Sequence, residues 1–148
     1  MAIILQIPFW ICEEMVAQAV AEMPQECCGL LAGQALLGRV SKRYPLVNGA
    51  ASPVLYEADA QGLLWAFKDM RALGLDLLAI YHSHPTSDSL PSATDLLRNS
   101  YGAEVVHLIV SLKGDAPWMR GWHLEEKGYR EAAWECCDDE VVRSEPGA

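Results

Sequence analysis

The sequence predicts a single α+β or α/β domain built around a mixed β-sheet. A chain of 148 residues is about one domain long and can bury a core. Hydrophobic residues make up 51% of it and charged residues 21%, which is typical of globular rather than disordered proteins. Short apolar runs that suit strands are interleaved with two longer amphipathic segments that suit helices, and this alternation indicates the fold class.

The first half of the chain is expected to hold several short strands and one long helix. Apolar residues recur at every fourth position across residues 8 or 9 to 23, which predicts a helix that Pro24 ends. Four strands are expected, over residues 2–7, 27–33, 36–47 and 54–57, with a loop over residues 48–53. Pro45 indicates that the third of these strands is an edge strand or is irregular at its end.

The second half of the chain is expected to contain two further helices. Asp59 is a good N-cap for the first of them, which extends to Leu73 and stops at Gly74. The second helix is short and runs from Ser92 to Arg98. Strands are expected over residues 75–82 (running on to His84), 105–111, 116–126 and 129–137. The last two strands are expected to form a hairpin, and a helix over residues 129–137 is the alternative.

The charge and the hydropathy pattern exclude several classes of partner. Twenty acidic residues against eleven basic ones give a net charge of −9, so the surface repels nucleic-acid backbones. No apolar run reaches the ~18 residues that span a bilayer, and the N-terminus lacks the basic start of a secretory signal. We therefore expect a cytoplasmic enzyme or binding module with no nucleic-acid or membrane partner. The sequence leaves open whether the chain forms a homodimer.

The five cysteines do not resemble a disulfide framework. Their number is odd, and four of them are adjacent pairs: Cys12, Cys27, Cys28, Cys136 and Cys137. We expect reduced, half-buried thiols. A structural zinc site between the two pairs is disfavoured because neighbouring residues on a strand point to opposite faces. A redox role is left open.

Two histidines and a Ser-x-x-Asp segment form the most informative pattern. His82 and His84 lie two residues apart on a strand, so both project from one face, roughly 6–7 Å apart. Ser92 and Asp95 share a face of the short helix, and the loop after Pro85 is long enough to bring that helix over the strand end. Two imidazoles and one carboxylate suit Zn²⁺ and leave its fourth position for water, as in catalytic zinc sites.

Each of these residues also has a structural interpretation. Ser92 is a good helix N-cap, and Asp95 suits the acidic first turn of a helix. Asp88 is a rival carboxylate ligand, but no helix fixes it. His107 and His123 are expected to be structural.

The same residues resemble the signature of the JAMM (MPN+) metalloproteases. The segment His82-Ser83-His84-Pro85, six intervening residues and Ser92-Ala93-Thr94-Asp95 match it at every motif position. Residues 24–33, Pro-Gln-Glu-Cys-Cys-Gly-Leu-Leu-Ala-Gly, resemble the family's early segment with a glutamate. The resemblance implies one cytidine-deaminase-like MPN domain over residues 1–143, with a curved mixed sheet and two main helices. Residues 144–148 are expected to form a frayed tail.

The resemblance also implies a role for each motif residue. His82, His84 and Asp95 would bind one Zn²⁺ per chain. Glu26 would contact the metal-bound water as general base, and Ser92 would hydrogen-bond the developing oxyanion. Without its companions Glu26 would be interpreted as a surface carboxylate at a strand edge.

Small stand-alone bacterial members of the family are the most similar. They imply hydrolysis of a peptide or isopeptide bond after the C-terminal Gly-Gly of a ubiquitin-like sulfur-carrier protein, whose tail would add as a strand beside an exposed sheet edge. The alternatives are a non-catalytic MPN scaffold, a zinc amidohydrolase acting on a small amide, and a RadC-like protein. The acidic charge disfavours the last, because it gives no basic footprint for DNA.

Overall fold

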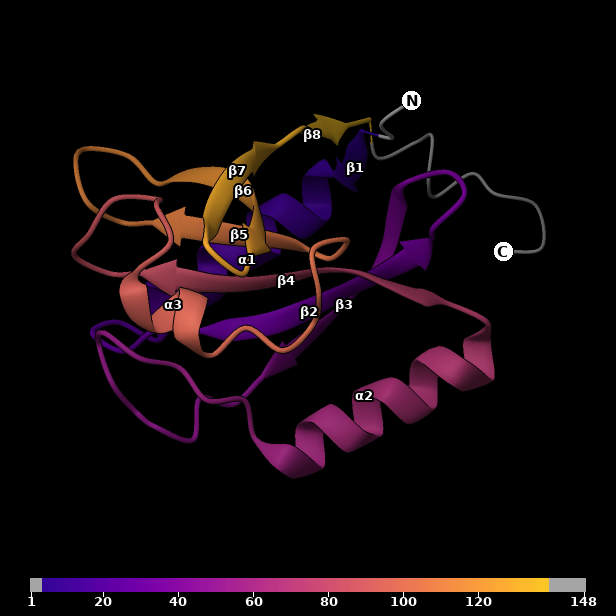
Figure 1. Cartoon of the computed structure of the whole chain (residues 1–148), viewed down its shortest axis with the longest axis horizontal. Coiled ribbons are helices and arrows are strands. Elements are labelled where there is room, and N and C mark those ends of the chain that lie inside the picture. Colours follow the sequence, from indigo (N-terminus) through magenta and orange to yellow (C-terminus); the bar gives the residue numbers. More distant parts are fainter. Residues whose placement is uncertain (1–3, 139–148) are drawn as a thin grey trace.

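The computed structural model describes residues 4–138, which form one eight-stranded sheet with three helices (Figure 1). In chain order the elements are β1 (Leu5–Pro8), α1 (Phe9–Ala21), β2 (Cys28–Gln34), β3 (Arg39–Leu46), α2 (Ala60–Leu73), β4 (Asp76–His84), α3 (Ala93–Leu97), β5 (Val106–Ser111), β6 (Trp118–Glu125), β7 (Gly128–Ala132) and β8 (Trp134–Cys137). The mixed α+β fold class is confirmed. Within residues 4–138, no helix combines the length and the apolar character that a membrane span requires.

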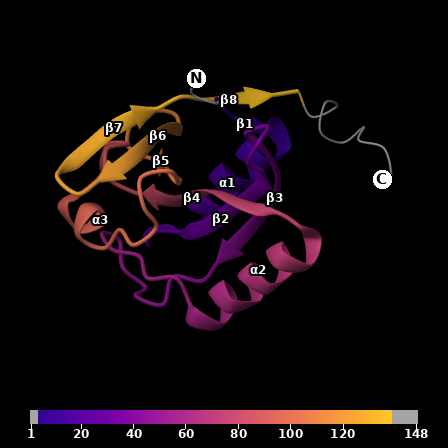
Figure 2. The ribbon, with the colours of Figure 1, turned by 45° about the vertical axis from the view of Figure 1, so that its right-hand side comes forward.

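The sheet is mixed and curved, with the strand order β7-β6-β5-β4-β2-β3-β1-β8 (Figure 2). β4 pairs in parallel with β5, and β1 pairs in parallel with both β3 and β8. The other neighbours are antiparallel. β4 therefore lies in the middle of the sheet, with β2 on one side and β5 on the other.

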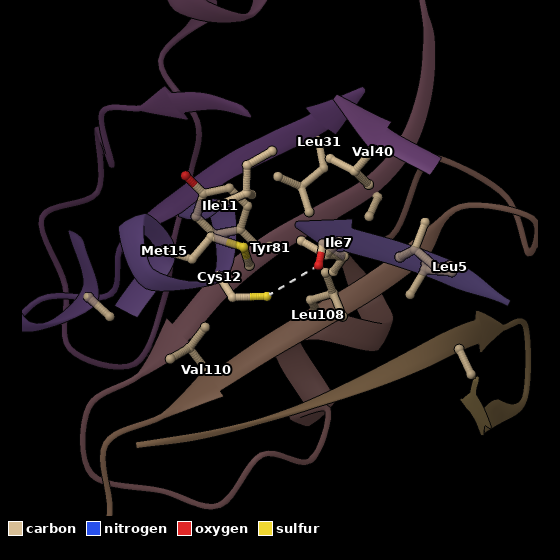
Figure 3. Packing of buried hydrophobic residues seen from close by; sticks show 14 of the residues in the cluster. Leu5, Ile7, Ile11, Cys12, Met15, Leu31, Val40, Tyr81, Leu108 and Val110 are labelled. Atoms are coloured by element: carbon tan, nitrogen blue, oxygen red, sulfur yellow. Dashed lines mark hydrogen bonds between the residues drawn. The ribbon is translucent and has the colours of Figure 1, made fainter. Parts of the chain in front are cut away.

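One face of the sheet packs against α1. Tyr81 and Leu108 point to this face and are fully buried with Ile11 and Met15 of the helix (Figure 3). Apolar burial of this kind contributes roughly 1.5–3 kcal/mol for each large side chain. This is the main core of the molecule.

The opposite face of the central strands packs against α2. Ile80 alternates with Tyr81 along β4 and contacts the cluster that contains Leu30, Ala66 and Met70. Because side chains alternate along a strand, the residues two and four positions after Ile80 also point to this second face. Those residues are the two histidines of the predicted metal site.

The helix predictions are confirmed. The Asp59 carboxylate accepts a hydrogen bond from the Gly62 N–H at 3.0 Å, and Gly74 ends α2 with φ +68°, a conformation that suits glycine. α1 ends at Ala21, two residues earlier than the periodicity predicts. Ser92 caps α3 as expected.

Two strand predictions need correction. The expected strand over residues 54–57 is wrong: within this segment the structure has no strand, and the nearest pairing is an isolated bridge between Asn48 and Ala58. The strand expected from residue 36 begins at Arg39, because residues 34–38 form a turn in which the Gly38 N–H donates to the Gln34 carbonyl at 2.9 Å. Pro45 lies near the end of β3 and is paired with Gly29 of β2. β3 pairs with β1 at Arg39, at its other end.

The last expected strand is divided in two. The hairpin of β6 with β7 is confirmed, and the helix alternative for residues 129–137 is wrong. After Ala132 the chain leaves β6, and β8 pairs with β1 instead, with Cys136 beside Ile7. The first strand covers Leu5–Pro8. The predicted tail over residues 144–148 lies outside the described residues.

Candidate active site

The two histidines at the end of β4 converge on one point. His82 and His84 are 1% and 3% exposed, and their Nε2 atoms lie 3.1 Å apart. α3 brings Asp95 above them, with its Oδ2 atom 3.2 Å from His82 Nε2 and 3.3 Å from His84 Nε2. The three side chains that the spacing predicts as metal ligands thus come together.

A reciprocal cap fixes the Asp95 carboxylate. The Ser92 hydroxyl oxygen accepts the Asp95 N–H at 3.0 Å, and Asp95 Oδ2 accepts the Ser92 N–H at 2.8 Å. This capping box stabilises a helix of only five residues. The structural interpretation of Ser92 is therefore correct, and the carboxylate oxygen held by the cap is the one that faces the histidines.

The loop between β4 and α3 is anchored by a buried serine. The Ser89 hydroxyl donates to the Ile109 carbonyl and accepts the Arg120 N–H, while the Ser89 carbonyl accepts the Trp122 indole N–H. Three contacts from β5 and β6 thus hold the loop down. No sequence pattern marked this serine, because its partners are backbone groups and a distant tryptophan.

Neighbouring groups orient both imidazoles. His84 Nδ1 lies 2.8 Å from the Asp88 carbonyl, and donation to that oxygen leaves Nε2 as the electron-pair donor. The His82 ring stacks on Tyr56, with centroids 4.6 Å apart. The Asp88 side chain faces Lys113 instead, 3.6 Å away, so Asp88 contributes its carbonyl rather than the carboxylate considered as a rival ligand.

The three donor atoms fit a tetrahedral zinc ion. Atoms bonded to one tetrahedral zinc at 2.0–2.1 Å lie roughly 3.3–3.4 Å apart, close to the 3.1–3.3 Å found here. Among residues 4–138, His82, His84 and Asp95 are the one group of three or more potential ligands that is close enough to share an ion. None of the five cysteines belongs to it.

The electrostatics of the group also suit a cation. Burial opposes ionisation of Asp95, but the two imidazoles and the Ser92 N–H hold its pKa well below the usual value. Burial alone would lower the pKa of His84. Hydrogen bonds to Asp95 and to the Asp88 carbonyl outweigh burial, so the pKa of His84 is raised. The Asp95 carboxylate therefore stays ionised, and its negative charge favours a cation bound between it and the two imidazoles.

Glu26 lies two residues before the start of the neighbouring strand β2, beside the end of β4. Cys28 is in register with His82, and Cys27 and Ser83 exchange two hydrogen bonds of 2.8 and 3.1 Å. Continuing this antiparallel register places Glu26 opposite His84, on the same face. The middle residue of the His-Ser-His segment thus fixes the glutamate segment, a role that the sequence did not indicate.

The Glu26 carboxyl is buried and has an unsatisfied oxygen. The residue is 3% exposed, and Oε1 has no hydrogen-bond partner among the described residues. Burial raises the pKa of Glu26 to about 8; His84 partly offsets the rise and Asp95 adds to it. A buried polar atom without a partner is costly and marks a position where water or an ion completes the structure.

Asn48 joins Glu26 to the loop that follows β3. Its amide donates to the carbonyls of Glu26 and Leu55, both at 2.9 Å. Its side-chain oxygen accepts the N–H groups of Ala50 and Glu57, also at 2.9 Å. Every hydrogen-bonding position of this amide is used on backbone, which explains why residues 54–57 do not form a strand.

A cavity of about 200 Å³ lies beside Asp95. Its walls come from the 55–58 segment, from α3 and the residues after it, and from Leu63 and His107. The residues of the two segments are Leu55, Tyr56, Glu57, Ala58, Thr94, Asp95, Arg98, Asn99, Ser100 and Tyr101. His107 is buried, and burial lowers its pKa to about 4. It is therefore a neutral wall residue, whereas His123 lies away from this cavity and contacts the Ala103 carbonyl at 2.8 Å.

The position of the site changes one expectation. β4 has hydrogen-bonded neighbours on both sides, and the outermost strands of the sheet are β7 and β8. A substrate tail therefore cannot add as a strand directly beside the histidines. The backbone that borders the cavity is the irregular 55–58 segment.

Three curated relatives of the chain are named as a desampylase, a conjugate cleaving protease and a peptidase. The chain is 40% identical to a desampylase of Haloferax volcanii over 65% of this chain and 69% of that protein. It is 43% identical to a probable TtuB-protein conjugate cleaving protease of Thermus thermophilus over 64% and 62% of the two chains. It is 35% identical to a CysO-cysteine peptidase of Mycobacterium tuberculosis over 55% and 56%.

Solved structures and a family model agree with these relatives. A protein of Desulfitobacterium hafniense is 32% identical, with a TM-score of 0.79 over 90% of this chain and 92% of that chain. A JAB1/MPN domain protein of Archaeoglobus fulgidus shares the fold, with a TM-score of 0.57 at 20% identity over 90% and 97% of the two chains. The model of prokaryotic homologs of the JAB domain matches residues 11–125, which include all five motif residues. The chain belongs to this Prok-JAB family.

Proposed function

We propose that this protein is a zinc-dependent metallopeptidase that hydrolyses the peptide or isopeptide bond after the C-terminal Gly-Gly of a ubiquitin-like sulfur-carrier protein. The observation that carries the proposal is the triangle of His82, His84 and Asp95 donor atoms, 3.1–3.3 Å on a side, on the same face as the buried carboxyl of Glu26. A non-catalytic scaffold has no use for this combination. The names of the relatives favour cleavage of carrier conjugates.

Zinc would be held by His82, His84 and Asp95, and would supply a Lewis acid that lowers the pKa of a coordinated water toward ~7. The orientation of the ligands is already fixed by protein groups, since His84 Nδ1 faces the Asp88 carbonyl and Asp95 is held by the Ser92 N–H. Little reorganisation is then needed when the ion binds.

Glu26 is the group that moves protons. Its raised pKa, about 8 in the absence of a cation, reflects burial. A nearby divalent cation favours the carboxylate form, so bound zinc would bring that pKa down toward the working range of a general base. The Glu26 carboxylate takes a proton from the attacking water and passes it to the nitrogen of the departing amine.

Ser92 can serve both as a helix cap and as a hydrogen-bond donor. Its oxygen accepts the Asp95 N–H, which leaves the hydroxyl proton available. That proton can be donated to the carbonyl oxygen of the substrate as negative charge develops there. The cap fixes the Ser92 oxygen, so the donor is preorganised.

The cavity beside Asp95 is the place for the carrier tail. It holds about 200 Å³, which suits a narrow extended segment rather than a folded protein surface. An extended tail can run along the irregular 55–58 segment, and glycines pass where larger side chains would meet Tyr56 or α3. We therefore expect the enzyme to require small residues immediately before the cleaved bond.

The test uses a ubiquitin-like carrier protein that bears residues beyond its Gly-Gly end. The purified chain is loaded with zinc, incubated with this carrier, and the products are weighed by mass spectrometry. We expect loss of the residues after the second glycine, abolition of cleavage by a chelator, and recovery when zinc is added back. A carrier ending in Ala-Ala is the matched control substrate.

Three outcomes would overturn the proposal. Cleavage that persists in the metal-free protein would exclude the metallopeptidase mechanism. If simple N-acyl amino acids are hydrolysed and the carrier is left intact, the protein is a small-amide hydrolase instead. Absence of bound zinc together with absence of any hydrolysis would indicate a scaffold.

A further inference from the structure

The structure brings together two cysteines from opposite ends of the chain. Cys12 lies on α1 and Cys136 on β8, 124 positions apart, yet their Sγ atoms are 2.9 Å apart. The spacing of the cysteines along the chain does not indicate that these two lie together. The contact lies on the face of the sheet opposite the candidate active site, and the proposed function does not use it.

The distance is short for two sulfur atoms that are not bonded. Two oxygen atoms joined by a hydrogen bond are already about 2.7–2.8 Å apart, and sulfur is larger than oxygen. Two thiolates on one tetrahedral zinc, with bonds of about 2.3 Å, would lie about 3.8 Å apart. A disulfide bond is about 2.05 Å long. The observed 2.9 Å lies between these two values, but among residues 4–138 neither cysteine belongs to a group of three or more potential metal ligands. A covalent pair is therefore favoured over a shared metal ion.

The fold fixes both side chains in this position. Cys136 is in register with Ile7, which is fully buried, and it packs against the same core cluster as Cys12. The Cys12 thiol also faces the Ile7 carbonyl, at 3.9 Å (Figure 3). α1 packs across β1 and β8, so the helix and the last strand meet at this point. Cys137 follows on β8 and points to the opposite face.

We propose that Cys12 and Cys136 are a modification site at which a peroxide forms a reversible intrachain disulfide. Cys136 is the more accessible of the two, whereas Cys12 is 8% exposed. The Cys136 sulfur attacks a peroxide oxygen, which gives a sulfenic acid and releases water. The Cys12 sulfur then attacks the sulfenic sulfur and releases a second water. Two thiols lose two electrons and two protons, and one hydrogen peroxide becomes two waters.

The disulfide would attach a short outermost strand of the sheet to α1. β8 has four residues and pairs with β1 alone among the described strands. A cross-link between positions 12 and 136 closes a long loop, and long loops gain the most from cross-linking. Oxidation is therefore expected to raise the melting temperature and to slow hydrogen exchange of the β8 amides.

Thiol counting on the full chain tests the proposal. The reduced chain has five thiols, which are titrated in denaturant after brief exposure to hydrogen peroxide and quenching. One disulfide consumes two of them, so we expect three to remain, together with a mass loss of two hydrogens and one cross-linked peptide pair containing Cys12 and Cys136. A thiol reductant should restore all five. Cys27 and Cys28 should survive, because burial raises their pKa values to about 11 and about 12.

Matched variants make the result specific. Cys136→Ser should retain all four remaining thiols, whereas Cys137→Ser should go from four to two. Cys12→Ser should form no cross-link and stop at the Cys136 sulfenic acid, with a mass gain of one oxygen. Circular dichroism before oxidation checks that each variant is folded. The proposal is overturned if the cross-link joins Cys137 or Cys27 instead, if Cys136→Ser loses thiols as the native chain does, or if all five thiols survive the peroxide.

Discussion

Glu26 is the residue at which stability and activity conflict most directly. Its carboxyl is buried with one unsatisfied oxygen, and burial raises its pKa to about 8. Such a group is costly to the fold, and proteins retain costly groups at functional sites. The amide of glutamine has almost the same shape and does not ionise.

Glu26→Gln should retain zinc and lose turnover. The three ligands are untouched, whereas the proton acceptor is gone, so the rate should fall by ~10²-fold or more. Metal content by mass spectrometry and cleavage of the extended carrier measure the two quantities on one preparation. Turnover at the native rate would show that another group is the base, and loss of zinc would show that Glu26 is a ligand.

Asn48 is the residue that sequence analysis most clearly missed. Asn-Gly is a turn signal and predicts only a loop here, and a single sequence cannot show that the amide reaches back to the Glu26 carbonyl. Its four hydrogen bonds link Glu26 to one wall of the cavity. It is a positioning residue rather than a catalytic one.

Asn48→Ala should leave four backbone groups without partners. We expect a loss of about 2–4 kcal/mol in the free energy of unfolding, and a fall in kcat/KM even at temperatures where the variant stays folded. Urea titration and carrier cleavage check the two effects. Asn48→Asp is the informative companion, because it keeps the acceptor for Ala50 and Glu57 but directs a carboxylate at two carbonyls. If Asn48→Asp behaves like the native chain, the donor half of the network is unimportant.

At the scale of elements, the packing of β2 against β4 requires a glycine at position 29. A Cβ on Gly29 would lie 2.3 Å from the Tyr81 ring, which crosses over that position. The Tyr81 hydroxyl lies within hydrogen-bonding distance of Gln18 and Arg43 and so cannot withdraw freely. The glycine of the Cys-Gly-Leu-Leu run is thus explained by packing against β4, directly beside His82.

Gly29→Ala should destabilise the protein by about 1–3 kcal/mol, the usual cost of overpacking. Thermal unfolding is the measurement. Gly128→Ala is the matched control, since a Cβ there has nothing within 4 Å. Equal melting temperatures for the two variants would mean that Tyr81 moves aside at no cost.

Local signals in the sequence were enough for some elements and not for others. Asp59 and Gly74 define the ends of α2 through chemistry that acts within a few residues, so both ends could be predicted. The separate strand β8 could not be predicted, because it pairs with β1 rather than with β6. Its partner residue Ile7 lies more than a hundred residues earlier in the chain. The five motif residues were predicted from spacing and resemblance, whereas Tyr56, Ser83 and Ser89 act through contacts that no spacing records.

At the scale of the whole molecule, the proposed metal site joins two elements of the fold, β4 and α3. His82 and His84 belong to the central strand, and Asp95 belongs to a helix of five residues held by its cap and by the Ser89 anchor. An ion shared between them would tie α3 to the sheet. Metal binding to the native state alone adds to its stability in proportion to the logarithm of ligand excess.

Chelation should therefore lower the melting temperature as well as abolish activity. With free zinc at ~100 times its dissociation constant, the native state gains about 2.7 kcal/mol, which shifts the melting temperature by several degrees. Scanning calorimetry with zinc, with chelator, and with zinc restored measures this shift. Asp95→Asn should show a much smaller response, and a native-sized response in that variant would place the ion elsewhere.

The central position of β4 also bears on how such an enzyme could acquire new targets. The histidines lie on a strand that is paired on both sides, whereas the adjoining 55–58 segment is held by Asn48, by the Gly49 N–H and by one isolated bridge. Insertions between residues 49 and 54 would leave the Tyr56 ring stacked on His82 and so leave the ligand geometry in place. Redesign of selectivity should start there, while the chemistry is left alone.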